Sequence, residues 1–179
     1  MQQDIQKVII TEGEIHSMVR ALAHRIQAEH NGETLHVVAI YDGSILFLAD
    51  LIRHMSIPLR LYGLRAKSYF GGTQSTGRVE ISGFDPAEVR GQPVLLVDDI
   101  LDTGLTLHAV RRQLEEAGAM SVKTCVFLCK ERIREVPVEA DYHCRTIPDE
   151  FVVGYGLDYR GLYRNLPFVG ILKREVYLP

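Results

Sequence analysis

Three aspartates lie close together in the stretch VLLVDDILDTGLTL, residues 94–107. Asp98 and Asp99 end a run of apolar residues that is typical of a buried strand, and Asp102 follows three residues later. Ionised carboxylates accept hydrogen bonds from sugar hydroxyl groups, and they also bind hard cations such as Mg²⁺. The pattern is therefore suited to a sugar, to a hard cation, or to both together.

Small and hydroxyl-bearing residues follow, where we expect a helix to begin. The first backbone N–H groups of a helix have no partner within it and attract anions. Thr103 and Thr106 add hydroxyl groups, and Gly104 lets a phosphate approach the backbone closely. A single Asp or Thr before a helix is an ordinary cap. The whole pattern after an apolar strand instead favours a site for a ribose 5-phosphate.

Three other phosphate-binding or acidic motifs do not fit this chain. The string G-x-x-x-x-G-K-[ST] of a P-loop does not occur in it. Phosphatases of the haloacid-dehalogenase type have Asp-x-Asp after the strand, but position 100 is isoleucine. A response-regulator receiver would begin with a similar strand, but it would leave the 93 preceding residues unexplained.

Apolar strands alternate with helices along the chain, which predicts an α/β fold with a mainly parallel sheet covered on both faces. The length of 179 residues is expected to form one domain, residues 1–179. The expected strands are 35–40, 58–66, 93–99, 121–130, 151–158 and 168–173. The expected helices are 11–26, with a Thr11–Glu14 capping box, 45–55, and 105–118, which Gly118 ends.

Polar residues gather where the expected strands end. They are Tyr41–Ser44, Asp98–Thr106, Lys130 and Leu157-Asp158. Because ligands of open α/β sheets bind at the carboxyl ends of the strands, we expect one shared cleft there. The polar stretch 67–83 is rich in Gly, Ser and Thr and is expected to be a mobile functional loop.

Charge and cysteine content limit the possible partners and location. A formal net charge of −3 provides no basic field for nucleic acid or an anionic membrane. We find no signal peptide and no apolar segment long enough to span a bilayer, so a cytoplasmic protein is expected. Cys125, Cys129 and Cys144 are expected to be reduced thiols, because they lack the spacing of a zinc site or a disulfide framework.

The stretch VLLVDDILDTGLTL resembles the phosphoribosyl-pyrophosphate-binding motif of type I phosphoribosyltransferases. The wider pattern is similar to the hypoxanthine-guanine phosphoribosyltransferases of purine salvage. SYFGGTQSTG resembles their mobile loop, and PDEFVVGYGLDYRGLYRNLPFVGIL resembles their purine-binding segment. The similarity covers about residues 37–172 and implies the type I phosphoribosyltransferase fold, with a small hood formed from the chain ends.

The resemblance implies an activity and its partners. The expected reaction is Mg²⁺-dependent transfer of phosphoribose from phosphoribosyl pyrophosphate to hypoxanthine and also guanine, which gives IMP or GMP and pyrophosphate. The protein is expected to be a homodimer or homotetramer and to bind neither nucleic acid nor membrane. The alternatives are a phosphoribosyltransferase for xanthine or another base, and a non-catalytic regulator that senses nucleotides or the sugar diphosphate.

The resemblance also implies roles for individual residues. Asp102 would be the general base that takes a proton from the purine, and Lys130 would select 6-oxopurines through their exocyclic oxygen. Ribose and its phosphate would be bound by Asp98, Asp99, Thr103, Gly104, Leu105 and Thr106. The purine would contact Lys130, Phe151, Val152 and Asp158, the pyrophosphate Gly43, Ser44 and Arg164, and Mg²⁺ Asp98, Asp99 and Asp158, while Ser68 and Tyr69 would close as a lid.

Two positions depart from the family pattern. The family usually has Glu-Asp where this chain has Asp98-Asp99, and Leu-Lys-Gly where it has Tyr-Asp-Gly. The carboxylate of Asp42 in place of a lysine should weaken the binding of a strongly anionic leaving group. We expect Asp42 to pair with a basic residue, either Arg65 or Lys67 or a residue of a partner subunit.

Overall fold

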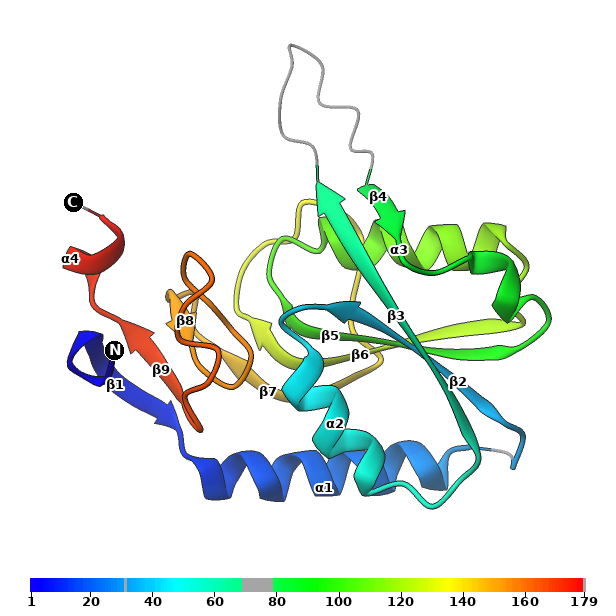
Figure 1. Ribbon diagram of the computed structural model, residues 1–179, viewed down its shortest axis with the longest axis horizontal. Helices are drawn as coiled ribbons and strands as arrows, with labels where there is room; N and C mark the ends of the chain where they lie inside the picture. Colours follow the sequence, from blue (N-terminus) through cyan, green and yellow to red (C-terminus); the bar gives the residue numbers. More distant parts are fainter. Residues whose placement is uncertain (31, 69–78, 179) are drawn as a thin grey trace, which may run out of the picture.

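A computed structural model describes residues 1–30, 32–68 and 79–178, and its largest element is a six-stranded sheet (Figure 1). The strand order is β4-β3-β2-β5-β6-β7. β4 runs antiparallel to β3, and the other neighbouring strands run parallel. Their bounds are β2 (Leu35–Tyr41), β3 (Leu59–Ser68), β4 (Val79–Ser82), β5 (Pro93–Leu101), β6 (Ser121–Lys130) and β7 (Tyr142–Ile147).

Helices cover both faces of this sheet. α1 (Glu12–Ala28) and α2 (Ile45–Arg53) pack on one face, and α3 (Leu105–Glu116) packs on the other. Side chains alternate between the two faces along β2, so Val37 and Ala39 join the core under α1 and α2, while Val38 joins the core under α3. Two covered faces explain why the central strands are apolar at nearly every position.

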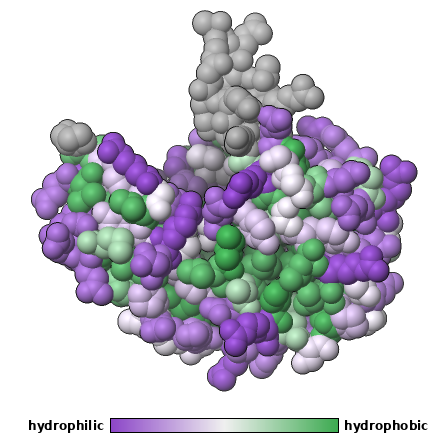
Figure 2. All heavy atoms as spheres, in the orientation of Figure 1, coloured by the Kyte–Doolittle hydropathy of each residue, from purple (hydrophilic) through white to green (hydrophobic). Residues whose placement is uncertain are grey.

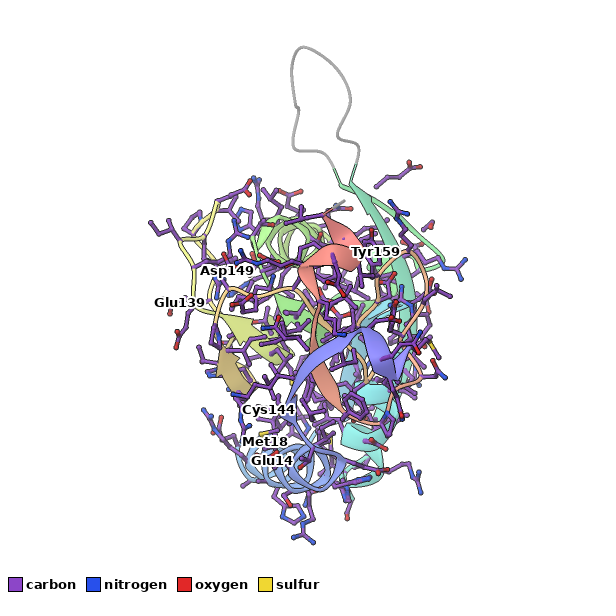
Figure 3. The ribbon with its side chains drawn as sticks, turned by 90° about the vertical axis from the view of Figure 1, so that its left-hand side faces the viewer. Glu14, Met18, Glu139, Cys144, Asp149 and Tyr159 are labelled. Atoms are coloured by element: carbon purple, nitrogen blue, oxygen red, sulfur yellow. The ribbon has the colours of Figure 1, made fainter. Side chains whose placement is uncertain are left out.

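α1 begins as the sequence predicts. The Thr11 side chain accepts a hydrogen bond from the Glu14 backbone, and the Glu14 side chain accepts one from the Thr11 backbone, which confirms the capping box. Glu14 also accepts a hydrogen bond of 3.2 Å from Arg145 of β7. Figure 3 shows Glu14, Met18 and Cys144 close together at the junction of α1 and β7.

A hood made from both chain ends lies beside the main sheet (Figure 1). Its three-stranded sheet has the order β1-β9-β8 and is antiparallel. A small core of Val153, Tyr163, Leu166 and Leu172 holds it together. This arrangement confirms the hood that the resemblance implies. Its elements are β1 (Ile5–Ile10), β8 (Val152–Val153), β9 (Val169–Leu172) and α4 (Arg174–Tyr177); two short 3-10 helices, η1 (Gln2–Asp4) and η2 (Pro86–Val89), complete the described structure.

Parts of the predicted strand pattern were wrong. The segment 151–158 contains only the two-residue strand β8, because the chain turns at Gly154–Gly156, where all three residues have positive φ. β3 continues to Ser68 and pairs with β4, so both ends of the expected loop 67–83 are strand. The expected strands also omitted β1 and β7.

The three cysteines are free thiols. Burial raises the pKa of Cys125 and Cys129 in β6, and it raises the pKa of Cys144 to about 12. Protonated thiols of this kind pack as small apolar side chains. No helix within the described residues has the length and apolar character that crossing a bilayer requires.

Candidate functional site

Two adjoining cavities open at the carboxyl edge of the parallel strands. The first has a volume of about 320 Å³, and its wall comes from residues 40–43 at the end of β2, residues 98–104 at the end of β5, and Asp158 and Arg164 of the hood side. The second, of about 180 Å³, lies between Lys130 at the end of β6 and Phe151. Asp99, Ile100, Asp102 and Asp158 line both cavities, so the two form one continuous site.

The turn between β2 and α2 is packed tightly against β5 and the hood. A Cβ atom at Gly43 would collide with the carboxylate of Asp99, and one at Gly156 would collide with the carbonyl oxygen of Gly43. Gly43 lies on the wall of the first cavity. The Ser44 side chain does not, because its buried hydroxyl group donates a hydrogen bond of 2.6 Å to the Ile40 carbonyl oxygen.

Asp98 and Asp99 both face the first cavity, although β5 continues past them to Leu101. The Asp99 backbone N–H donates a hydrogen bond of 2.9 Å to Asp98 Oδ1. Burial raises the pKa of both carboxyl groups, and the nearby charge of Asp99 raises the pKa of Asp98 further. A ligand that supplies positive charge here would relieve the repulsion between the two carboxylates.

The loop between β5 and α3 places small residues at the start of the helix. Gly104 has φ +86°, and a Cβ atom there would collide with Val138. The backbone conformation and the lack of space therefore both require glycine. Thr103 and Thr106 join Gly104 on the wall of the first cavity. Leu105 begins α3 but does not line the cavity, and its N–H donates to Thr103 Oγ1 at 3.4 Å.

Asp158 and Arg164 form a pair on the hood side of the first cavity. Arg164 Nη2 lies 2.9 Å from Asp158 Oδ1, and its Nη1 donates to the Gly156 carbonyl oxygen at 2.6 Å. Asp158 Oδ2 accepts from the Gly161 N–H at 2.7 Å. Both oxygens of Asp158 thus already have donors. Among the described residues, no group of three or more side chains is arranged to hold a metal, so Asp98, Asp99 and Asp158 do not form a ready-made cluster.

The second cavity brings together Lys130, Phe151 and Val152, as the resemblance implies. The Phe151 ring stacks on Tyr177 with a centroid distance of 4.8 Å and an interplanar angle of 23°. It also contacts Tyr159 edge-on at 5.6 Å. Neighbouring rings therefore hold the Phe151 ring in place beside the cavity.

Asp102 belongs to a network of four charged side chains. Lys130 Nζ lies 2.8 Å from Asp102 Oδ2, and Arg132 Nη1 lies 2.7 Å from Asp102 Oδ1. Asp149 Oδ1 lies 3.5 Å from Lys130 and 4.0 Å from Arg132. Neither Arg132 nor Asp149 is among the site residues that the sequence predicts. The charges beside Lys130 and Phe151 were the available signal, but sequence spacing does not show that they meet.

These cations set the ionisation of Asp102. Burial alone would raise its pKa, but hydrogen bonds and charges from Lys130 and Arg132 outweigh burial and lower the pKa. Arg134 supports the same loop by donating to the Asp102 carbonyl oxygen at 2.6 Å and to the Lys130 carbonyl oxygen at 2.9 Å. Asp102 is therefore ionised at neutral pH, as a general base requires.

Asp42 lies on the wall of the first cavity and pairs with Arg65 of β3 at 3.3 Å, which confirms one of its expected partners. Both side chains are more than half exposed. Of the two predicted lid residues, Ser68 ends β3. Tyr69 lies outside the described residues.

Comparisons with known proteins agree on one family. The family described as "Phosphoribosyl transferase domain" matches residues 10–160. A hypoxanthine-guanine phosphoribosyltransferase of Streptococcus pneumoniae is 42% identical over 177 residues, which cover 99% of this chain and 98% of that protein. The solved hypoxanthine phosphoribosyltransferase of Staphylococcus aureus has a TM-score of 0.92 at 40% identity and covers 100% of this chain and 97% of its own. A Trypanosoma cruzi hypoxanthine phosphoribosyltransferase, solved as a ternary substrates complex, has a TM-score of 0.92 at 35% identity and covers 98% of this chain and 99% of its own.

Proposed function

The chain belongs to the phosphoribosyl transferase domain family, and from this membership we propose that it transfers phosphoribose from phosphoribosyl pyrophosphate to hypoxanthine and guanine in purine salvage. The observation that carries the proposal is the position of Asp102, which lines both cavities. The first cavity would bind the sugar phosphate and the second the purine. Asp102 then lies where the new bond between them would form.

The donor fits the first cavity by its chemistry. The hydroxyl groups of Thr103 and Thr106 and the N–H groups at the start of α3 would bind the 5-phosphate, with Gly104 allowing close approach. The Leu105 N–H would join them once it leaves Thr103 Oγ1. Asp98 and Asp99 would accept hydrogen bonds from the ribose hydroxyl groups. The backbone of Gly43, the N–H of Ser44 and the guanidinium of Arg164 would bind the pyrophosphate.

The residues also fit a magnesium ion. Asp98 and Asp99 are neighbouring hard oxygen donors whose pKa values are raised by burial, so a divalent cation would favour their ionised forms. They would hold Mg²⁺ together with oxygen atoms of the donor. Asp158 would assist once Arg164 turns to the pyrophosphate and frees one of its oxygen atoms. When bound, the ion would neutralise charge on the departing pyrophosphate.

The purine fits the second cavity. Its face would lie on Phe151, the backbone of Val152 would bond its edge, and Lys130 Nζ would donate to the 6-oxygen. A bond then forms between a ring nitrogen and the anomeric carbon as the bond to pyrophosphate breaks. Asp102 takes the proton that the imidazole ring of the purine gives up.

Water must be kept away while this exchange occurs. Transfer at an anomeric carbon passes through an oxocarbenium-like state that water would also attack. Ser68 and Tyr69 would belong to the lid that closes over the site. The lid role rests on the resemblance of their sequence to the family's mobile loop.

The test is a panel of bases. Purified protein is incubated with phosphoribosyl pyrophosphate and Mg²⁺, separately with hypoxanthine, guanine, xanthine, adenine and uracil, and nucleotide is measured by chromatography. We expect product from hypoxanthine and guanine and none from adenine or uracil. Product from xanthine alone would support the alternative substrate. Donor binding without any product would support the regulator instead.

Asp102→Asn is the matched variant for that panel. It keeps the size of the side chain but removes the proton acceptor. We expect turnover to fall by about 10²-fold or more, because a positioned general base contributes about 10²–10⁴-fold. Binding of phosphoribosyl pyrophosphate should remain measurable. Unchanged turnover would show that Asp102 is not the base.

We also propose a cytoplasmic homodimer or homotetramer. Large apolar side chains are exposed at the turn 41–44, at the start of α2 and on β3, and Figure 2 shows hydrophobic side chains on the face over α2 and β3. An exposed apolar face of this kind is typical of subunit contacts. Free cysteines fit a reducing compartment. Light scattering at several concentrations would test the assembly, and a monomer throughout would contradict it. The exposed residues are Tyr41, Ile45, Leu46 and Leu61.

A further inference from the structure

Asp102 is fully engaged before any ligand arrives. Its Oδ2 is bound by Lys130 at 2.8 Å and its Oδ1 by Arg132 at 2.7 Å. Each oxygen keeps a further lone pair, but a cation bound to it makes it a weaker acceptor for a substrate proton. Release of one cation would therefore leave one oxygen of Asp102 better able to act as the general base.

The two cations differ in position. Lys130 lines the second cavity together with Asp102, whereas Arg132 lines neither cavity. The Lys130 side chain is only 12% exposed, so its partners must come from the protein or from a ligand in the cavity. A ligand in the second cavity can therefore draw Lys130 away from Oδ2, while Arg132 continues to hold Oδ1 and fixes the orientation of the carboxylate.

Asp149 provides a second anion for Lys130. Its Oδ1 lies 3.5 Å from Lys130 Nζ and 4.0 Å from Arg132 Nη1. Asp149 comes from the segment between β7 and β8, and Figure 3 shows it away from α1. Lys130 thus lies between two carboxylates, so the loss of one contact still leaves its charge paired with the other carboxylate.

We propose that the 6-oxygen of a bound purine breaks the ion pair between Lys130 and Asp102, which we call the latch. Asp149 is then the positioning residue that keeps Lys130 in reach. The inference rests on the proposed function and adds the coupling between recognition and catalysis. A 6-oxopurine accepts the hydrogen bond from Lys130 and thereby frees Asp102 Oδ2 for the ring-nitrogen proton. A purine without that oxygen leaves the latch closed, so selectivity acts on the chemical step as well as on binding.

The experiment compares hypoxanthine with unsubstituted purine at saturating donor and Mg²⁺. In Lys130→Met the latch is absent, so turnover of hypoxanthine should fall while turnover of unsubstituted purine rises. In Asp149→Asn we expect the KM for hypoxanthine to rise about fivefold, which is the order of one exposed charge contact. The KM for phosphoribosyl pyrophosphate should stay unchanged, which also shows that each variant is folded.

Glu150→Gln is the matched control, because it removes a neighbouring carboxylate that enters none of the ion pairs found in the described part of the chain. It should leave both bases unaffected. If the natural protein turns over hypoxanthine, equal behaviour of Asp149→Asn and Glu150→Gln, or a loss of both bases in Lys130→Met, overturns the latch and leaves the function standing. If the natural protein turns over no base, the proposed function fails and the latch fails with it.

Discussion

The two cations beside Asp102 determine its ionisation and its strength as a base. Lys130 and Arg132 outweigh the effect of burial and lower the pKa of Asp102. A lowered pKa keeps the carboxylate ionised to more acidic pH, so the acid limb of the activity profile should lie below the ordinary range of an aspartate. The same cations make Asp102 a weaker base, and release of Lys130 would restore its basicity when the purine binds.

The pH profile of Arg132→Gln tests this balance. The variant removes one of the cations that lower the pKa of Asp102, so the pKa should rise. We therefore expect the acid limb of kcat/KM for hypoxanthine to move to higher pH. The measurement is initial rate against pH with donor at saturation. An acid limb that does not move would mean that another group controls it.

Asp42 places an unusual negative charge where the pyrophosphate would bind. Its carboxylate lies on the cavity wall and is only partly neutralised by the exposed Arg65 at 3.3 Å. We expect Asp42→Asn to bind pyrophosphate about three- to tenfold more tightly, because surface charge pairs contribute about 1 kcal/mol. Arg65→Gln should bind it more weakly.

Product inhibition by pyrophosphate measures both changes at fixed hypoxanthine. Glu88→Gln is the control, since η2 contributes nothing to the wall of the first cavity. Equal inhibition constants for all variants would show that Asp42 and Arg65 do not influence the leaving group.

At the scale of elements, the prediction succeeded where one physical signal dominated. β5 is apolar because both of its faces are covered, and α3 begins and ends at glycines with positive φ, Gly104 and Gly118. Within the described sheet, the edge strand β7 has β6 as its one neighbour, and buried and exposed side chains do not alternate regularly along it. The apolar segment 151–158 resembles a strand in sequence because its side chains are buried whether the chain is extended or turned.

The candidate site, like the fold, contains some residues that the sequence predicts and others that it does not. Asp98, Asp99 and Gly104 follow one another in a local pattern that sequence alone reveals. Arg132 and Asp149 meet because the parallel strands β6 and β7 end at the same edge of the sheet, where Lys130 pairs with Ile147. Contacts between segments far apart in sequence require the fold to be known first.

The turn after β8 is tied to α2 by one buried hydroxyl group. Tyr155 Oη donates to Asp50 Oδ2 at 2.6 Å, and its ring packs edge-on against Phe127 at 4.9 Å. Burial, and then the hydrogen bond to Asp50, raise the pKa of Tyr155, so the hydroxyl stays protonated. We expect Tyr155→Phe to lower the free energy of unfolding by about 1–3 kcal/mol, because Asp50 loses a donor.

Urea unfolding followed by circular dichroism would measure the loss. Tyr177→Phe is the control, since its ring stacks on Phe151 and its hydroxyl group forms no hydrogen bond within the described residues. A midpoint shift of equal size in both variants would point to ring packing and contradict a role for the Asp50 bond.

At the scale of the whole molecule, the site lies between two bodies of structure. Asp99 and Asp102 belong to the main sheet and its loop, whereas Phe151 and Arg164 belong to the hood side. The wall of each cavity includes residues of the main sheet and residues of the hood side. A nucleotide that fills both cavities must therefore connect the hood to the main sheet, whereas pyrophosphate alone would occupy only the first.

Hydrogen exchange with and without IMP would detect this connection. We expect IMP to protect amides in residues 102–106 and in residues 151–158 together, because one ligand holds both segments and stabilises only the folded arrangement that contains them. At 100 times its dissociation constant, the ligand should add about 2.7 kcal/mol to the free energy of unfolding. Pyrophosphate should protect residues 102–106 less, because its proposed contacts are Gly43, Ser44 and Arg164 and not the start of α3. If IMP protected the loop 102–106 and left 151–158 unchanged, the purine would not lie against Phe151, and the division of the site into a sugar cavity and a base cavity would be wrong.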